Sequence, residues 1–397
     1  MKNLYGILVW FLVTLFVVYA FCLNTAAAVF SGPIQTTLHA SNLDVSIAVG
    51  VFIVGFALMQ IPAGYLLDKY NARVVVSCGV LILAIGNMLT SFANNIVLFS
   101  LSNFIQGLGA SFAFIAAGVI ISQWFSQRLF PILFGLTQTI SCILASVIHY
   151  VFSVSLATHT WNEIYWILAI LGLILFVLIL IFVQSPSNYD RAKNVSLKQS
   201  LFSVIKNRQI MLCALAATTS FGTLLAYAGF WYLNVQKFYS IQTLDAVVIS
   251  GTMFAGIGIG TPFLGWISNC LKSRKSVIHV TLCLGTMALL MCLYLPHYQV
   301  DALLIINIIS FLTGFLLSGS MLFYTVVSEI STNSTRGVAL SITNTGVFLF
   351  NTLLLFLPYL FVTSTSHTYF TYLWILPFSL IVSILFNYFI CESYKNS

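Results

Sequence analysis

Charged residues divide the chain into long uncharged stretches, and this pattern sets the expected fold. Each stretch is mainly apolar and long enough for a membrane-spanning helix, which needs about 20 residues. The ten stretches are residues 3–43, 45–67, 74–127, 129–162, 164–189, 209–236, 246–271, 276–300, 302–328 and 337–391. Two of them have room for two helices, with turns predicted at Ala93–Asn95 and at Thr363–Thr368. The pattern therefore predicts twelve transmembrane helices joined by short loops.

The composition agrees with a chain that is solvated mainly by lipid. Of its 397 residues, 60% are hydrophobic and only 6% are charged, which leaves too little polar surface for a water-soluble globule. The first apolar run is too long for a signal peptide, and we interpret it as the first span. We expect an all-α, multi-pass membrane protein in the inner membrane of a bacterial cell.

The positions of the basic residues predict the orientation in the membrane. With the N-terminus inside, fourteen basic and four acidic residues fall on cytoplasmic loops, a net charge of +10, whereas Lys237 and four acids lie outside, a net charge of −3. Because Lys and Arg stay on the cytoplasmic side during insertion, both termini are expected to be cytoplasmic. The formal charge of +7 thus follows from topology, and no nucleic-acid partner is expected.

The two halves of the chain repeat each other. The longest polar stretch, residues 185–208, is the predicted cytoplasmic linker between an N-terminal bundle (1–184) and a C-terminal bundle (209–397). Gly64–Arg73 (GYLLDKYNAR) aligns without gaps with Gly265–Arg274 (GWISNCLKSR), and each segment joins the second and third spans of its half. Such a duplication predicts two pseudo-symmetric six-helix bundles with a substrate cleft between them at mid-membrane.

The first copy of this segment resembles the signature loop of the major facilitator superfamily, in which Gly is followed four residues later by Asp and then by a basic residue at the far end. Gly64 allows two helices to approach closely. Asp68 is expected to cap or pair with the end of a neighbouring helix, near Lys69 and Arg73. The resemblance implies a gate that locks the cytoplasmic side. An ordinary solvated turn is the alternative.

The second copy and the loop after the tenth span are less complete. Gly265 and Arg274 persist there, but Asn269 replaces the acid, so we expect a weaker latch. Glu329 and Arg336 are similar to the acidic and basic clusters on the corresponding loops of the family, and a contact between them is expected to close the inner gate. Exposed charges that contribute about 0–1 kcal/mol are the alternative.

The fourth span carries Asn103, Gln106 and Gly107, which are similar to the fourth-helix motif of the superfamily, an Arg followed by Gln-Gly. Asn103 stands at the Arg position, and the fifth span lacks the Gly-Pro pair of the drug antiporters. Because the resemblance associates that Arg with proton coupling in drug antiporters, a multidrug/proton antiporter is disfavoured. Simple helix packing is the alternative role of Gly107.

The middle of the predicted spans holds no Asp, Glu, Lys or Arg, although such charges usually mark ion coupling or a charged substrate. Neutral polar and aromatic side chains remain as substrate-binding candidates. They are Tyr19, Asn24, Thr25, Gln138, His149, Tyr227, Tyr324 and Asn344. Histidine is the side chain that ordinarily changes charge near neutral pH, so His149, the only histidine well inside a predicted span, is the candidate for proton coupling. Packing contacts or bonds to the helix backbone are the alternative roles.

These observations predict a secondary transporter that moves a small neutral or zwitterionic solute by alternating access, as a proton symporter or a uniporter. A multidrug or metabolite efflux antiporter is the alternative. The sequence shows neither clustered catalytic or metal-ligating side chains nor a phosphate-binding Gly-rich loop, so no enzyme, metal or cofactor is expected. We expect a monomer whose partners are the lipid bilayer, a small-molecule substrate and, in symport, a proton.

Overall fold

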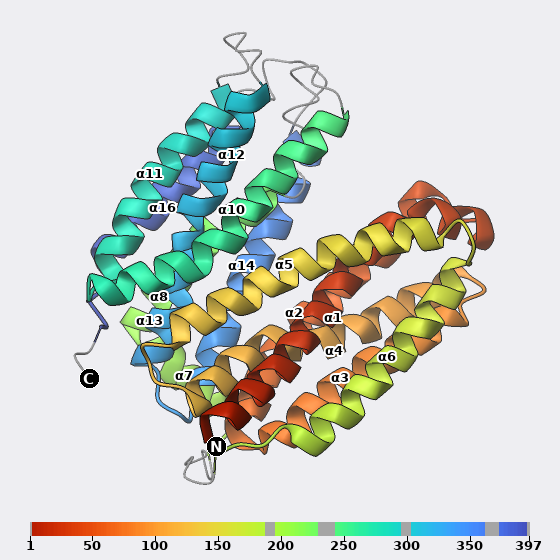
Figure 1. Ribbon diagram of the computed structural model, residues 1–397, viewed down its shortest axis with the longest axis horizontal. Coiled ribbons are helices and arrows are strands. Elements are labelled where there is room, and N and C mark those ends of the chain that lie inside the picture. Colours follow the sequence, from red (N-terminus) through yellow and green to blue (C-terminus); the bar gives the residue numbers. More distant parts are fainter. Residues whose placement is uncertain (1, 187–194, 229–242, 295–302, 362–372, 395–397) are drawn as a thin grey trace. The chain divides into compact units, whose positions relative to one another are not determined.

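The computed structural model describes residues 2–186, 195–228, 243–294, 303–361 and 373–394, which form helices joined by short connections, with no strand among them (Figure 1). The chain divides into two compact units. Unit 1 comprises Met1–Ser126, Ile140–Phe202 and Thr332–Ser341, and unit 2 comprises Gln127–Thr139, Ser203–Ser331 and Ile342–Ser397. Helices α5 (Phe130–Ser155) and α14 (Arg336–Phe361) contribute residues to both units.

Each unit contains several helices of different lengths. Those of unit 1 are α1 (Lys2–Leu38), α2 (Asn42–Lys69), α3 (Ala72–Ser91), α4 (Ile96–Trp124) and α6 (Trp161–Phe182). Those of unit 2 are α8 (Arg208–Ala226), α10 (Thr243–Cys270), α11 (Arg274–Tyr294), α12 (Leu303–Leu317), α13 (Leu322–Ile330) and α16 (Ile375–Tyr388). A short helix, α7 (Leu197–Lys206), lies in the polar stretch that we predicted as a linker.

The described helices confirm a multi-pass membrane fold. Eleven candidate spans among them are long and apolar enough to cross a bilayer, and one of these, Leu303–Ile330, combines α12 and α13. The described part of α16 is shorter, with 14 residues. The turn predicted at Thr363–Thr368 lies outside the described residues. The predicted orientation and the bundle boundaries at residues 185–208 stay predictions.

Polar residues at the helix ends explain where several helices begin. Ser41 and Asp44 form a capping box at the start of α2, and Thr160 and Glu163 form another at the start of α6. Asn95 accepts a hydrogen bond from a backbone amide in the first turn of α4. This cap begins α4 directly after the turn that the sequence predicted between the third and fourth spans.

Pairs of glycines allow the closest helix crossings in each unit. A Cβ added to Gly55 of α2 or to Gly107 of α4 would clash with the backbone of the other helix. Gly256 of α10 and Gly314 of α12 show the same reciprocal arrangement in unit 2. Backbones approach this closely only where no side chain intervenes. The α2–α4 and α10–α12 crossings are therefore equivalent, as expected for pseudo-symmetric halves.

A 3₁₀ turn interrupts the span formed by α12 and α13. It is η3, Ser318–Met321, and all four of its residues are buried. A Cβ added to Gly319 would clash with the side chain of Thr281 of α11, so η3 packs tightly on that helix. Such a turn inside a long helix often marks a hinge or a functional site. The interruption lies directly before α13, the helix that carries Tyr324.

Candidate functional site

The end of α2 and the start of α14 approach each other closely in unit 1. A Cβ added to Gly64 would clash with the carbonyl oxygen of Gly337 and with Ser341 Oγ, and one added to Gly337 would clash with Gly64 O. The two glycines thus allow the backbones to touch. This approach brings the carboxylate one turn after Gly64 to the beginning of α14.

Asp68 caps the N-terminus of α14. Its side chain is 1% exposed, and its Oδ1 and Oδ2 accept hydrogen bonds from Gly337 N at 2.7 Å and from Val338 N at 3.1 Å. Amides in a first helical turn have no acceptor within their own helix, and the positive end of the helix dipole favours a carboxylate. Asp68 therefore links α2 to α14 by two charge-assisted hydrogen bonds. Its gating role stays a prediction.

We expect Asp68→Asn to weaken this link. Asn has one acceptor oxygen where Asp has two, and its NH₂ group would face a backbone N–H, so one buried amide loses its acceptor. The expected loss of stability is about 1–3 kcal/mol, measured as a lower Tm of the purified protein. Asp44→Asn is the control, because it makes the same change in the same helix at a capping carboxylate that is exposed, where water replaces the lost acceptor, so a smaller loss is expected. Equal Tm values for both variants would contradict the assigned cap.

The basic residues of the segment bind other groups in unit 1. Lys69 Nζ donates a hydrogen bond to Tyr65 OH at 2.9 Å and lies 5.3 Å from the centroid of that ring. Arg73 Nε donates to Val183 O, at the end of α6, at 3.0 Å. The Arg73 bond holds the beginning of α3 against the end of α6.

The equivalent segment of unit 2 uses an amide in place of a carboxylate. A Cβ added to Gly265 would lie 3.0 Å from the backbone of Pro131, so α10 passes closely over the start of α5. Asn269 Nδ2 donates to Arg128 O at 2.7 Å, and its Oδ1 accepts from Arg274 at 2.8 Å. This contact reaches a carbonyl before α5 rather than the amides of a first helical turn. The weaker latch that we expected in this copy stays a prediction.

A buried ion pair lies next to Asn269. Arg274 and Glu329 are 1% and 8% exposed, and a guanidinium nitrogen of Arg274 lies 3.0 Å from Glu329 Oε1. Arg274 also donates a hydrogen bond to Ser268 Oγ at 2.5 Å. Because both charges are shielded from water, each depends on the other and on these hydrogen bonds. The pair joins the start of α11 to the end of α13.

Arg336, which we expected to contact Glu329, belongs to unit 1, whereas Glu329 belongs to unit 2. Arg336 donates a hydrogen bond to Asn333 Oδ1 at 3.0 Å, within the turn that precedes α14. Glu329 pairs with Arg274 inside its own unit. The Glu329–Arg336 gate contact stays a prediction.

The residues of the fourth-helix motif make their described contacts inside unit 1. Asn103 Nδ2 donates to Phe99 O, one turn earlier in α4, at 2.8 Å. Gln106 Nε2 donates to Thr90 Oγ1 of α3 at 2.6 Å. Gly107 is one of the two glycines at the α2–α4 crossing. These contacts hold α4 against α3 and α2.

Among the substrate-binding candidates of unit 1, Tyr19 participates in helix packing. Its hydroxyl donates to Leu168 O of α6 at 2.8 Å and accepts from Asn87 Nδ2 of α3 at 2.5 Å. The hydroxyl is therefore already engaged by two neighbouring helices. The candidates whose side chains lie outside the described residues are Asn24, Thr25 and His149.

The other candidates are buried in unit 2, with Gln138 6% and Tyr227 0% exposed. Tyr324 and Asn344, each 1% exposed, form a pair in which Tyr324 OH donates to Asn344 Oδ1 at 2.9 Å. The other end of the amide, Asn344 Nδ2, has no hydrogen-bond partner. A buried donor without an acceptor costs about 1–3 kcal/mol, so this N–H group is a strong candidate for binding a ligand.

Two aromatic rings lie beside Tyr324 of this pair. The ring centroids of Phe134 of α5 and Phe221 of α8 lie 5.6 Å and 6.4 Å from that of Tyr324. Helices α5, α8, α13 and α14 thus each contribute a side chain to one cluster in unit 2. Apolar walls with a few directed polar groups are typical of small-molecule sites.

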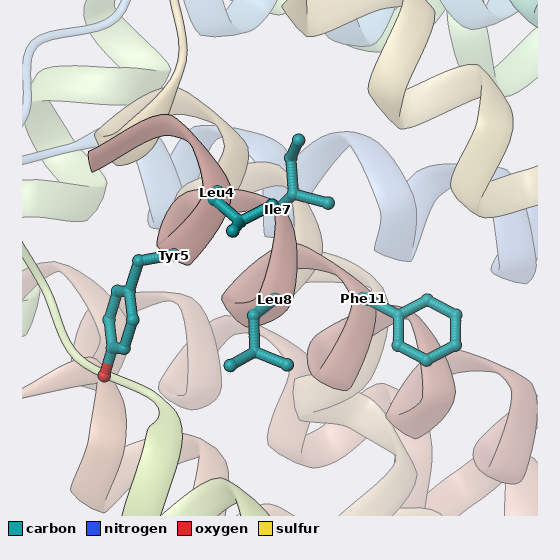
Figure 2. Close-up of a pocket in the computed structure, with 5 residues that line it drawn as sticks. All are labelled: Leu4, Tyr5, Ile7, Leu8 and Phe11. Carbon is teal, nitrogen blue, oxygen red and sulfur yellow. The ribbon is translucent and has the colours of Figure 1, made fainter. Parts of the chain in front are cut away.

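An apolar hollow lies beside the first turns of α1 in unit 1 (Figure 2). The residues that line it are Leu4, Tyr5, Ile7, Leu8 and Phe11. The side chains of Leu4, Ile7 and Phe11 are 75%, 46% and 44% exposed. These described lining residues are apolar except for the Tyr5 hydroxyl, which donates a hydrogen bond to Phe182 O at 2.7 Å.

The sequence profile of the Major Facilitator Superfamily matches residues 11–353. The chain belongs to this superfamily. Solved structures of superfamily members have the same fold. The match to the fucose:proton symporter FucP, in its outward conformation, spans 97% of this chain and 99% of FucP, with a TM-score of 0.74 and 16% identity. The match to the proton:xylose symporter XylE, bound to 6-bromo-6-deoxy-D-glucose, spans 97% of this chain and 96% of XylE, with a TM-score of 0.72 and 16% identity.

Relatives of similar sequence are named multidrug resistance proteins. The multidrug resistance protein MdtL of Escherichia coli is 25% identical over 238 residues, 58% of this chain and 59% of MdtL. The same protein of Shigella dysenteriae is 24% identical over 233 residues, again 58% and 59%. The chain thus matches less than two thirds of the length of these relatives. The superfamily assignment establishes the multi-pass membrane fold.

Sequence reasoning missed several residues of these clusters. The sequence indicated Arg274 as the basic end of a loop motif, but it did not predict that Arg274 pairs with Glu329, 55 positions away. It also passed over Asn87, the partner of Tyr19. A signal for Asn87 was present, because a buried amide inside a membrane span needs a hydrogen-bond partner.

Proposed function

We propose that this transporter moves a small neutral or zwitterionic solute by alternating access and that Asn344 and Tyr324 contribute to its binding site. The observation that carries the proposal is the buried Nδ2 of Asn344, which has no hydrogen-bond partner. An amide N–H binds an acceptor such as a hydroxyl, carbonyl or carboxylate oxygen. The absence of charged residues from the middle of the predicted spans favours a substrate without net charge.

The arrangement of the cluster supports this role. Because Tyr324 donates to Asn344 Oδ1, the carbonyl end of the amide is occupied and its N–H end is oriented. The rings of Phe134 and Phe221 offer apolar surface against which a sugar or aliphatic face packs. The fold-level likeness to sugar transporters is compatible with a polyhydroxylated substrate, although the fold alone does not identify one.

The gate belongs to the same proposal. Asp68 of α2, which caps the first turn of α14, forms with Gly64 and Gly337 a tight connection whose opening and closing would accompany the transport cycle. We further propose a monomer in the inner membrane with both termini in the cytoplasm, and His149 as the group that binds a proton if transport is proton-coupled.

Replacement of Asn344 tests the binding site. In proteoliposomes, we expect Asn344→Leu to lower the apparent affinity for the transported solute at least about tenfold, because a site built around a hydrogen bond discriminates strongly once the bond is lost. The solute is first found by counterflow with labelled monosaccharides, amino acids and nucleosides. Asn307→Leu is the control, since both ends of the Asn307 amide are bonded, to Leu303 O and to Thr252 Oγ1. If the Asn344→Leu variant keeps the affinity of the parent protein, Asn344 does not contribute to the binding site.

Efflux of drugs is the second candidate function, and the relatives named multidrug resistance proteins favour it. Asn103 at the position of the motif Arg argues against proton-driven drug export, since Asn carries no charge. Overexpression in a drug-sensitive host distinguishes the two functions. Increased tolerance to several unrelated drugs, with no counterflow of metabolites, would establish efflux in place of our proposal.

A further inference from the structure

The segment that follows α16 lies over the buried ion pair of unit 2. It comprises residues 389–394, and we call it the clasp. Gln209, at the start of α8, holds its first part: Gln209 Nε2 donates to Phe389 O at 3.3 Å, and Gln209 Oε1 accepts from Cys391 N at 2.9 Å. These two bonds fix the path of the chain after α16 against α8.

Glu392 fastens the clasp to the start of α11. Its Oε1 accepts from Arg274 N at 2.9 Å, and its Oε2 accepts from Ser273 Oγ at 2.6 Å and from Lys275 N at 3.1 Å. The two backbone amides belong to the first turn of α11, where intrahelical acceptors are lacking and the helix dipole favours an anion. Partial burial raises the pKa of Glu392, but these hydrogen bonds together lower it below its ordinary value. The carboxylate is therefore ionised at neutral pH.

The last two residues of the clasp contact the ion pair itself. Ser393 Oγ donates to Glu329 Oε2 at 2.6 Å, while Arg274 binds the other oxygen of the same carboxylate. The ring of Tyr394 lies 5.0 Å from the guanidinium carbon of Arg274, a cation–π contact. Both members of the pair are thus covered by the clasp, and both carboxylate oxygens of Glu329 are hydrogen-bonded.

We propose that the clasp is a positioning element that keeps Arg274 on Glu329 and holds the ends of α8, α11, α13 and α16 together while the transporter changes conformation. Alternating access needs helices that move as rigid groups, and helix ends without cross-links open independently. The clasp supplies such cross-links at one end of unit 2. The effect on turnover rests on the proposed transport function, whereas the effect on local opening does not.

Hydrogen–deuterium exchange of the purified full chain tests the local effect. In Glu392→Gln, an NH₂ group replaces an acceptor oxygen and faces donors, so we expect exchange of the Arg274 and Lys275 amides to accelerate at least about tenfold. Cys391→Ser is the control, because the Cys391 side chain is exposed and lies in the same segment. Its exchange should equal that of the parent. Parental exchange in Glu392→Gln would overturn the proposal.

Substitution of Ser393 separates positioning from folding. We expect Ser393→Ala to lower the transport turnover in proteoliposomes by about threefold to tenfold while the substrate affinity stays parental, and Ser393→Thr, which keeps the hydroxyl, to restore turnover. Parental turnover in Ser393→Ala, or an equal loss of affinity, would overturn the positioning role. If the parent protein transports no solute but the exchange results are as expected, the proposed transport function is wrong, whereas the role of the clasp in holding the helix ends is supported.

Discussion

Glu329→Gln is expected to destabilise the protein by about 3–5 kcal/mol, because it leaves the guanidinium of Arg274 buried without a negative partner. Arg274 is 1% exposed and reaches Glu329 at 3.0 Å, so water has little access to compensate the lost charge. The free energy of unfolding, measured by denaturation in mixed detergent micelles, gives the magnitude. Activity is expected to fall with stability, since the pair joins α11 to α13.

The control for this prediction is the double variant Arg274→Met/Glu329→Leu. Two apolar side chains of similar volume need no compensating charge, so the double variant should be more stable than either single variant. Arg208→Met tests the same substitution at an exposed Arg of the same unit and should change the stability little. A double variant that is less stable than Glu329→Gln alone would contradict this account of the pair.

Gly64→Val is expected to abolish transport and to lower the stability by at least about 1–3 kcal/mol, the usual effect of overpacking. The added side chain would clash with the backbone of Gly337, which cannot rotate away as a flexible side chain does. Displacing α14 would also pull the amides of Gly337 and Val338 away from Asp68. Proteoliposome transport and the Tm of the purified protein measure the two effects.

Gly50→Val is the matched control for this substitution. Gly50 belongs to the same helix, α2, but a Cβ added there has nothing within 4 Å. Both variants therefore share the change in helix propensity and differ in the contact with α14. Similar transport and Tm in the two variants would show that the close approach at Gly64 is not required.

The positions of the spans followed from the sequence because lipid imposes simple rules on length and polarity. The uncharged stretch 276–300, for example, coincides with α11 from Arg274 to Tyr294 over its described part. A helix in lipid must keep its charges at its ends, so the charges mark the ends even where helix propensity is weak. The same rule does not reveal η3, because Ser318–Met321 is neutral and small, as are many continuous spans.

Contacts between distant segments were beyond sequence reasoning. That Asp68 would reach a neighbouring helix was expected, but not that its partners would be the amides of Gly337 and Val338, which depend on how α2 and α14 approach. The contacts of the clasp could not be predicted either, because they also depend on how distant segments approach, and Glu392 and Ser393 lie in a short polar segment without any motif. Helix α7 was not predicted, because the stretch that contains it has a polar composition.

The spacing of the glycines in α2 and α10 limits how the length of the protein varies. Gly55 faces α4 and Gly64 faces α14, while Gly256 and Gly265 face α12 and α5 with the same separation in sequence. A helix rotates by about 100° per residue, so a one-residue insertion between the glycines of either pair would turn one of them away from its neighbour. Natural insertions and deletions should therefore be confined to the loops, and α2 and α10 should keep a fixed length.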